Sequence, residues 1–292
     1  MVEHGNGSRG ETYAALADET RIRILLALAD RYDEAWSAGW LTFSELRERV
    51  GVEDTSRFSY HLDELQDEFV VKSDGRYRPR VAALEIASAI RAGTYDGETV
   101  AVDRRQTDYE CPHCEQSLVA SYRDHSLYVG CPEHGAAVAF PTPPRALSDR
   151  TLDEVIDLSL RKHASDVRLL REGVCPRCWG SAAISFPRET VPESYLIDDV
   201  AYGTATCDDC WLSYPLPLAH AVLGHPAVET LYTDHGLQPA DAQIGPHDLA
   251  RVSDVDYQDG ATTAVRLTVG LGEDTLVLNL DHSCRVQDFQ RD

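Results

Sequence analysis

The chain has 292 residues, 43% of them hydrophobic, which is enough for a buried core and predicts about two domains. It carries 49 acidic and 27 basic residues, a formal net charge of −22, and the acidic excess runs along the whole chain. No signal pattern opens the sequence, and no apolar run approaches the ~18 residues of a membrane helix. We therefore expect a cytoplasmic protein with no membrane partner.

The acidic bias has a particular composition. Lys72 and Lys162 are the only lysines, and aspartate outnumbers glutamate. This composition is similar to that of proteins from salt-adapted archaea, whose surfaces are dense in carboxylates throughout. We expect a halophilic archaeal source, in which the charge reflects the salty solvent. A basic partner would instead require a concentrated acidic patch, and none is evident in the sequence.

The amino-terminal residues predict a series of helices. Apolar side chains at helical spacing predict a first helix over residues 12–30. A second helix is expected to start at Thr42 as N-cap, with Glu45 as its capping-box partner, and to stop at Gly51. A third helix is predicted over residues 55–66.

Strand and turn signals follow the third helix. An Asp-Gly turn at 74–75 predicts a hairpin of two short strands, and a last helix is predicted over 80–92. Helix, helix, turn, helix and hairpin is the order of a winged helix-turn-helix domain, here over residues 11–95. The last helix would close this domain or carry a dimer contact.

The third helix has two distinct faces. At 100° per residue, Phe58, Leu62 and Leu65 fall together and are expected to face the core. The hairpin stretch 72–80 carries four basic residues against one aspartate, a local net charge of +3. A helix of this kind reads base edges from its amino end, whereas a basic wing contacts phosphates. The candidate base contacts are Ser56, Arg57, Ser59 and Tyr60, and the candidate phosphate contacts are Lys72, Arg76 and Arg78.

Three segments together, "ALADETRIRILLAL", "SYHLDEL" and "DGRYR", resemble the ArsR-type family of winged-helix transcriptional regulators over residues 11–93. The resemblance implies a homodimer on a two-fold-related site in double-stranded DNA, usually acting as a repressor. Two features depart from the family. The stretch "SELRERVGVEDTS" has no cysteine, so metal sensing there is not implied, and Asp63 and Glu64 stand where basic residues often occur.

Two sets of cysteines follow in the second half of the chain. Paired ligands two residues apart allow a tight turn to direct both side chains to one tetrahedral zinc ion. The spacing predicts zinc ribbons over 106–141 and 174–215, with His113 and His125 as alternatives to His134. Since four protein ligands fill the zinc shell, both Zn²⁺ sites are expected to be structural. The predicted ligands are Cys111, Cys114, Cys131 and His134 in the first set, and Cys175, Cys178, Cys207 and Cys210 in the second.

The remaining segments connect and follow the ribbons. A spacer helix is predicted over 148–173, with Ser148 as N-cap and Gly173 as its stop. Residues 216–292 predict one or two short helices and then four strands of an antiparallel sheet. Cys284 is expected to be a buried strand residue. Four scattered histidines are expected to be solvated or to cap helices: His220, His225, His235 and His247.

The expected fold class is therefore α+β, with a winged helix-turn-helix, two zinc ribbons joined by a spacer helix, and a carboxyl-terminal antiparallel sheet. The expected function is a DNA-binding transcriptional regulator. It is not expected to be an enzyme, since the sequence has no nucleophile elbow and no Gly-rich phosphate loop. One alternative is a protein-interaction module whose winged helix no longer binds DNA. Another is a regulator with a small-molecule effector held between the ribbons and the spacer helix.

Overall fold

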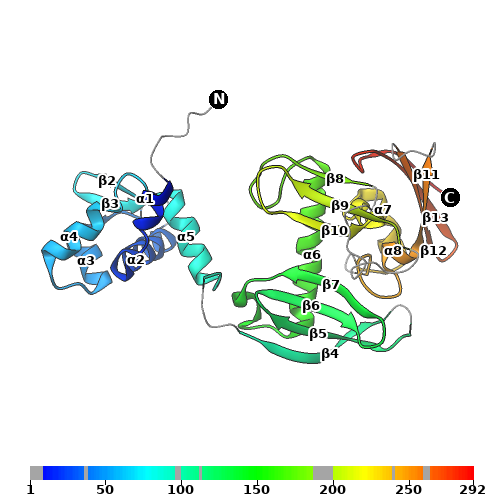
Figure 1. Cartoon of the computed structure of the whole chain (residues 1–292), viewed down its shortest axis with the longest axis horizontal. Helices are drawn as coiled ribbons and strands as arrows, with labels where there is room; N and C mark the ends of the chain where they lie inside the picture. The colour runs from blue at the N-terminus through cyan, green and yellow to red at the C-terminus, as the bar shows by residue number, and fades with distance from the viewer. Residues whose placement is uncertain are drawn as a thin grey trace. The chain divides into compact units, whose positions relative to one another are not determined.

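The structure is a computed structural model that describes residues 9–35, 39–95, 100–111, 114–186, 200–238, 241–258 and 264–292. The chain divides into two compact units, Met1–Glu98 and Thr99–Asp292, which are described separately (Figure 1). Within the described residues, no helix has both the length and the apolar character needed to span a membrane.

The first unit combines helices with a small antiparallel sheet of strand order β1-β3-β2. The predicted hairpin and the predicted helix after it are confirmed, while β1 is an additional strand that the sequence did not predict. In chain order its elements are α1 (Arg9–Ala14), α2 (Glu19–Ala35), β1 (Leu41–Thr42), α3 (Phe43–Val50), α4 (Thr55–Asp63), β2 (Val70–Ser73), β3 (Arg76–Pro79) and α5 (Val81–Arg91).

Several local predictions in the first unit are confirmed. The Thr42 side chain accepts a hydrogen bond from the Glu45 N–H, and the Glu45 carboxylate bonds back to the Thr42 N–H, which completes the capping box. Gly51 ends α3 at a φ of 71°. The hairpin turns at Asp74 and Gly75, both of which have positive φ as a type I′ turn requires. The three apolar residues predicted to face the core, Phe58, Leu62 and Leu65, are all buried.

Two helix boundaries differ from the prediction. The helix expected over 12–30 is two helices, because the Asp18 carboxylate accepts the N–H groups of Thr20 at 2.8 Å and Arg21 at 3.3 Å and so starts a new helix. The helix expected over 55–66 ends at Asp63. There the chain turns so that the Leu65 carbonyl can accept the N–H of Val70 at the start of β2, at 2.9 Å.

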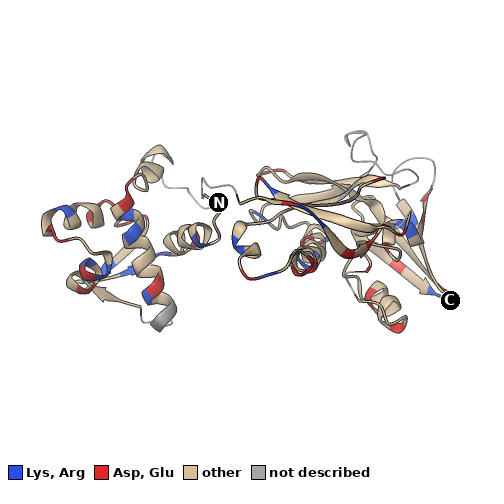
Figure 2. Cartoon of the chain, turned by 90° about the horizontal axis from the view of Figure 1, so that it is seen from below, with Lys and Arg blue, Asp and Glu red and all other residues tan. Residues whose placement is uncertain are grey.

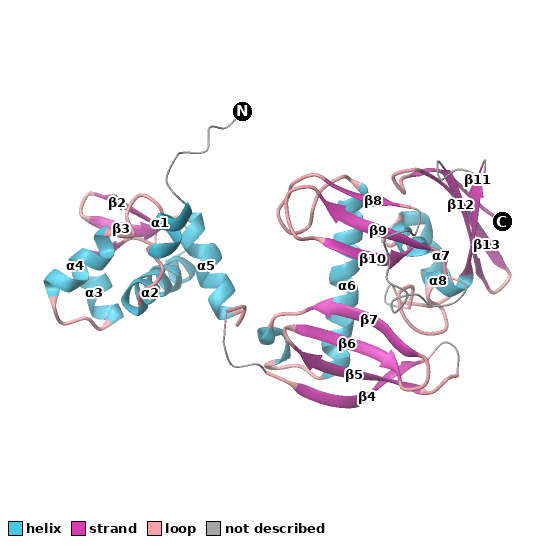
Figure 3. Ribbon diagram, in the orientation of Figure 1, coloured by secondary structure: helices cyan, strands magenta, loops and turns pink. Residues whose placement is uncertain are grey.

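The described residues of the second unit form three antiparallel sheets, shown as magenta arrows in Figure 3. The first has strand order β4-β5-β6-β7, the second β10-β9-β8, and the third β11-β12-β13-β14. The hairpin predicted between the first cysteine pairs is confirmed, with its turn at Asp124 and His125, and a further strand pairs on each side of it. The strands of the first two sheets are β4 (Val102–Glu110), β5 (Ser117–Arg123), β6 (Ser126–Cys131), β7 (Gly135–Pro141), β8 (Ala182–Ser185), β9 (Tyr202–Cys207) and β10 (Ser213–Pro217).

A long helix, α6 (Leu152–Arg171), belongs to two cores at once. Its amino-terminal half buries Val155, Ile156 and Leu160 against the first sheet, and its carboxyl-terminal half buries Val167 and Leu170 in the core that the other two sheets share. Figure 1 shows α6 running past both β4–β7 and β8–β10. In the small-molecule alternative, an effector would lie between α6 and the ribbons. The faces of α6 toward the sheets are instead packed with apolar side chains.

The predicted cap of this helix was wrong. Thr151 is the N-cap of α6 and forms a capping box with Glu154. Ser148 instead follows the 3-10 helix η2 (Pro144–Leu147), because that extra turn displaces the start of α6 by several residues. Gly173 follows the helix at a φ of 80°, as its predicted role as a stop requires.

The carboxyl-terminal part confirms the predicted antiparallel strands. Its elements are η4 (Leu218–Val222), α7 (Pro226–Asp234), α8 (Leu249–Val252), β11 (Ser253–Gln258), β12 (Ala264–Leu271), β13 (Asp274–Asp281) and β14 (Val286–Arg291). Cys284 is buried as predicted, although it lies in the turn after β13 and not in a strand.

The histidines of this part divide between two outcomes. His225 caps α7, because its ring nitrogen accepts the Ala227 N–H at 3.3 Å, so the predicted capping role is confirmed there. The prediction was wrong for His220, which is buried with its Nε2 2.6 Å from Asp248 Oδ1. The whole of η4 is buried in the core, and this burial removes His220 from solvent.

Candidate metal centres and candidate nucleic-acid interface

The candidate base-contacting residues lie on α4. Ser56, Arg57 and Tyr60 are exposed, with Tyr60 55% accessible to solvent. Ser59 is half-buried, and its hydroxyl lies 3.4 Å from Asp63 Oδ2. The predicted set therefore shares one helix, but Ser59 is less available than the other three.

The amino end of α4 carries its own anion. Asp54 caps the helix, and its carboxylate accepts the N–H groups of Ser56 at 2.8 Å and Arg57 at 3.0 Å. A helix end can bind a phosphate through such N–H groups, but here a side chain already occupies them. Phosphate contacts near α4 would therefore depend on cationic side chains.

The hairpin provides these cations. Lys72 and Arg76 are exposed, whereas Arg78 is half-buried and lies over the ring of Trp40 at 5.3 Å. The Lys72 ammonium lies 5.4 Å from the centre of the Tyr77 ring. Aromatic rings so placed hold the long side chains of Lys72 and Arg78 in defined positions. In Figure 2 basic and acidic residues are interspersed along the ribbon of both units. Residues 72–80 are a local exception, with four basic residues against one aspartate.

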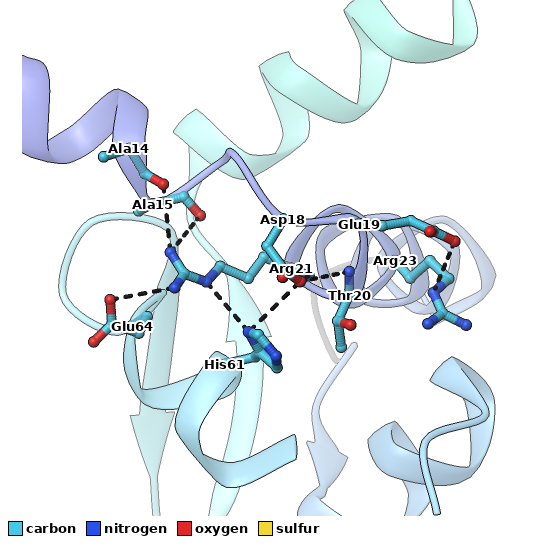
Figure 4. A network of polar contacts seen from close by, with 9 residues as sticks. All are labelled: Ala14, Ala15, Asp18, Glu19, Thr20, Arg21, Arg23, His61 and Glu64. Atoms are coloured by element: carbon cyan, nitrogen blue, oxygen red, sulfur yellow. Dashed lines mark hydrogen bonds and ion pairs between the residues drawn. The ribbon is translucent and has the colours of Figure 1, made fainter. Parts of the chain in front are cut away.

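A polar network that the sequence analysis missed connects α4 to the helices before it (Figure 4). The side chain of Arg21 is buried and its Nε lies 3.4 Å from Nδ1 of His61, which is also buried. The same guanidinium donates to the carbonyl of Ala15 at 3.2 Å and forms an ion pair with Glu64 at 3.4 Å. Asp18 Oδ1 lies 3.5 Å from the same His61 nitrogen.

This network changes the interpretation of Glu64. The sequence placed an uncompensated acid on the predicted recognition helix, but its charge is paired with Arg21. The sequence signal for this contact was that Arg21 and His61 each lie on an otherwise apolar helix face. Their spacing along the chain does not show that they meet, so the contact could not be predicted from the sequence.

The first cysteine set converges in the structure. All four ligand atoms lie within 4.8 Å of one another. Cys114 Sγ lies 3.7 Å from Cys131 Sγ, and His134 Nδ1 lies 3.5 Å from Cys111 Sγ and 3.4 Å from Cys131 Sγ. A tetrahedral ion with metal–sulfur bonds of ~2.3 Å and metal–nitrogen bonds of ~2.0 to 2.1 Å requires edges of about 3.8 Å between sulfurs and about 3.5 Å between sulfur and nitrogen, so the donors fit zinc. His125 lies in the β5–β6 turn and is not in the set, and His113 lies outside the described residues.

The second set is built in the same way from four cysteines. The sulfur atoms of Cys175 and Cys210 are 3.7 Å apart and those of Cys178 and Cys207 are 3.5 Å apart. All four lie within 4.8 Å of one another. Both predicted sets of ligands are thus brought together, each fits a zinc-ribbon module, and each could hold a metal ion.

Two family models match the chain. The one described as "Domain of unknown function (DUF7351)" matches residues 108–286, which is well over half of the chain and includes both cysteine sets. The chain belongs to the DUF7351 family. A second model, described as "Domain of unknown function (DUF7347)", matches residues 9–90 in the first unit. No curated protein and no solved structure matches the chain.

The DUF7351 segment holds its sulfur atoms with backbone N–H groups. Cys131 Sγ accepts the Glu133 N–H at 3.4 Å, and Cys175 Sγ accepts the Arg177 N–H at 3.4 Å. Burial alone would raise the pKa of each thiol, but these N–H groups and their neighbours outweigh it, and the pKa falls to about 6 for Cys131 and about 7 for Cys175. One thiolate, the form that binds a metal, is therefore favoured in each set. At Cys114, Cys178 and Cys210 a backbone N–H group also lowers the pKa, but burial and neighbouring thiols outweigh it and the pKa of each is raised.

Proposed function

We propose that this chain is a DNA-binding transcriptional regulator whose first unit is an ArsR-type winged helix-turn-helix domain. In this proposal α4 enters the major groove and the β2–β3 hairpin is the wing that contacts the backbone. The observation that carries the proposal is the exposed Arg57 face of α4 in the same unit as a hairpin with exposed Lys72 and Arg76. Arg57 is the candidate for a bidentate guanine contact.

Local charge allows an acidic chain to bind a polyanion. At 1 M salt the Debye length is ~3 Å, so a phosphate responds to the hairpin cations and not to distant carboxylates. Residues 72–80 carry a net charge of +3. Of the two acids at the end of α4, Glu64 is paired with Arg21, and Asp63 forms hydrogen bonds with Ser59 and Gln66. High salt also weakens phosphate contacts by counterion release, so specificity would depend on base contacts and on dimerisation.

The exposed apolar side chains of the first unit support a homodimer. Helix α5 buries only Ala83 and Ala87, whereas Val81 is 71% exposed and Ile90 is half-buried. Tyr13 of α1 is also exposed. A second copy packed on these helices would bury this surface and match a two-fold-related operator. Occupation of an operator excludes other proteins from it, so repression is the output we propose.

We propose that the two cysteine sets bind two structural Zn²⁺ ions. Each set supplies four protein ligands, which complete a tetrahedral shell and leave no position for a reacting molecule. This is the donor arrangement of a site that stabilises a fold. The chemistry proposed for the chain is therefore binding, with no catalysed reaction.

The test is selection of bound sequences from a random DNA duplex pool in molar potassium chloride. The intact chain is compared with the R57A/R76A/R78A variant and with R145A/R150A/R161A, a control that removes the same charge from exposed arginines of the second unit. We expect an inverted-repeat site to be enriched by the intact chain and by the control, but not by the first variant. Absence of enrichment by a folded, zinc-loaded chain would favour the protein-interaction alternative.

A further inference from the structure

The second cysteine set carries a pair of exposed tryptophans. Trp179 directly follows Cys178, and Trp211 directly follows Cys210, so both indoles extend from the metal end of the β8–β10 sheet. Trp179 is 84% exposed and Trp211 is 70% exposed. A buried tryptophan contributes much to the stability of a fold, and these two side chains contribute little because they are mostly exposed. We call the end formed by Arg177, Trp179, Asp208, Asp209 and Trp211 the tryptophan tip.

The backbone conformation at Trp179 indicates that this side chain does not serve to stabilise the fold. Its φ is 64°, in the left-handed region, which is unfavourable for a bulky residue. Glu115 and Gly135 also have positive φ after the second ligand of their turns, whereas Trp211, at the same position of the fourth turn, does not. Glycine adopts this conformation without strain, as Gly135 does. A strained, exposed aromatic residue where glycine suffices indicates a function for the side chain.

The charges around the two indoles favour a cationic ligand. The guanidinium of Arg177 already lies over the Trp211 ring at 5.3 Å, so one indole of the tip holds an arginine in the structure. The Asp209 carboxylate lies against Gly180, the residue after Trp179, and its Oδ2 is 3.3 Å from the Ser181 N–H. Asp208 is exposed beside it. A bare aromatic face next to carboxylates attracts a cation and repels a phosphate.

We propose that the tryptophan tip binds an arginine- or lysine-bearing segment of a partner protein. The cationic side chain would lie on the exposed Trp179 ring, as Arg177 lies on Trp211, with Asp209 as the nearby counter-charge. The partial desolvation of such a pair strengthens the cation–π attraction, which resists salt better than a surface ion pair does. This inference concerns the second unit and does not depend on DNA binding by the first.

The experiment measures binding of three labelled probes to the full-length, zinc-loaded chain in 1 M potassium chloride. The probes are an alternating glycine–arginine peptide, a glycine–glutamate peptide of the same length, and a single-stranded oligonucleotide. The variants are W179G, which removes the indole and suits the backbone, D209N, and F289A, a control at an exposed aromatic residue of the same unit. Zinc content and circular dichroism verify that each variant is folded.

We expect the arginine peptide to bind and the glutamate peptide not to bind. W179G should weaken the arginine complex by about fivefold or more, D209N should weaken it to a smaller extent, and F289A should leave it unchanged. The proposal would be overturned if either W179G or D209N bound the arginine peptide as tightly as the native chain does. Loss of oligonucleotide binding in W179G, with no effect on the peptide, would also overturn it and would assign the indoles to base stacking.

Discussion

Arg21 illustrates how a single buried cation can position a surface helix. Its side chain is only 11% exposed, and its guanidinium bonds to carbonyls at the end of α1, to His61 and to Glu64. It also lies 5.7 Å from the ring of Tyr60, a candidate base contact. A buried charge of this kind is retained only where its hydrogen-bonding groups are satisfied, and its removal leaves the partners without a donor. Arg21 thus connects the packing of α4 to the proposed DNA-reading surface.

We predict that R21A loosens the first unit locally. The substitution should cost about 2 kcal/mol, since it leaves His61 and the carbonyls of Ala14 and Ala15 without their donor. Hydrogen exchange measured by mass spectrometry should show faster exchange of the amides of α4. R23A is the control, because Arg23 is exposed, its ion pair with Glu19 is long, at 3.8 Å, and its hydrogen bond to the Val50 carbonyl, at 3.2 Å, is to α3 and not to α4. Equal exchange in R21A and R23A would contradict a positioning role for Arg21.

At the scale of elements, α6 depends on the cap that starts it. Thr151 and Glu154 exchange hydrogen bonds at the amino end, and Val155 and Ile156, in the first turns that follow, are buried against the first sheet. A frayed first turn would therefore expose core residues of that sheet. The cap and the packing of one sheet are in this way coupled.

The choice between two candidate caps gives a direct prediction. T151A should cost ~1 kcal/mol and accelerate hydrogen exchange at the Glu154 amide, because that substitution removes the side-chain oxygen that accepts the Glu154 N–H. S148A should change exchange by no measurable amount, since Ser148 follows η2 and does not cap α6. The same mass-spectrometric experiment measures both variants. A larger effect of S148A than of T151A would show that the helix starts earlier than residue 152.

The comparison of these two caps also shows what the sequence can predict. Contacts between near neighbours were predictable, such as the Thr42 capping box and the Asp74–Gly75 turn, since their physics is local. Thr151 has Glu154 three residues on, the same capping-box pattern as Thr42 and Glu45, whereas Ser148 has no such partner, so this cap too was predictable from the sequence. The Arg21–His61 contact joins residues 40 positions apart, and periodicity carries no information about which polar side chains meet. The metal ligands were predictable because two-residue spacing constrains both sulfur atoms of one turn.

At the scale of the whole molecule, the two units differ in what stabilises them. Both described metal-ligand sets lie in Thr99–Asp292, and all of their cysteines except the exposed Cys178 lie in or pack against the cores there. Cys111 and Cys131 are buried with the first sheet, and Cys175 is buried with the second. The first unit has a separate apolar core formed by residues of α2, α3, α4 and the hairpin. Metal binding should therefore be coupled to the folding of one unit and not of the other.

Removal of the metal should distinguish the second unit, which metal binding stabilises, from the first unit, which its apolar core stabilises. We expect two zinc ions per chain by elemental analysis, and we expect chelation to release both and to abolish exchange protection in the sheets of the second unit. Structural zinc contributes ~10–16 kcal/mol in small zinc-binding peptides, more than short strands obtain from their own packing. The amides of α2 and α4 should keep their protection, since no described ligand set lies in the first unit. C284S is the control, because Cys284 is buried outside both sets and its loss should leave two zinc ions bound. Loss of protection in α2 and α4 on chelation would mean that the first unit depends on the metal-bound second unit for its stability.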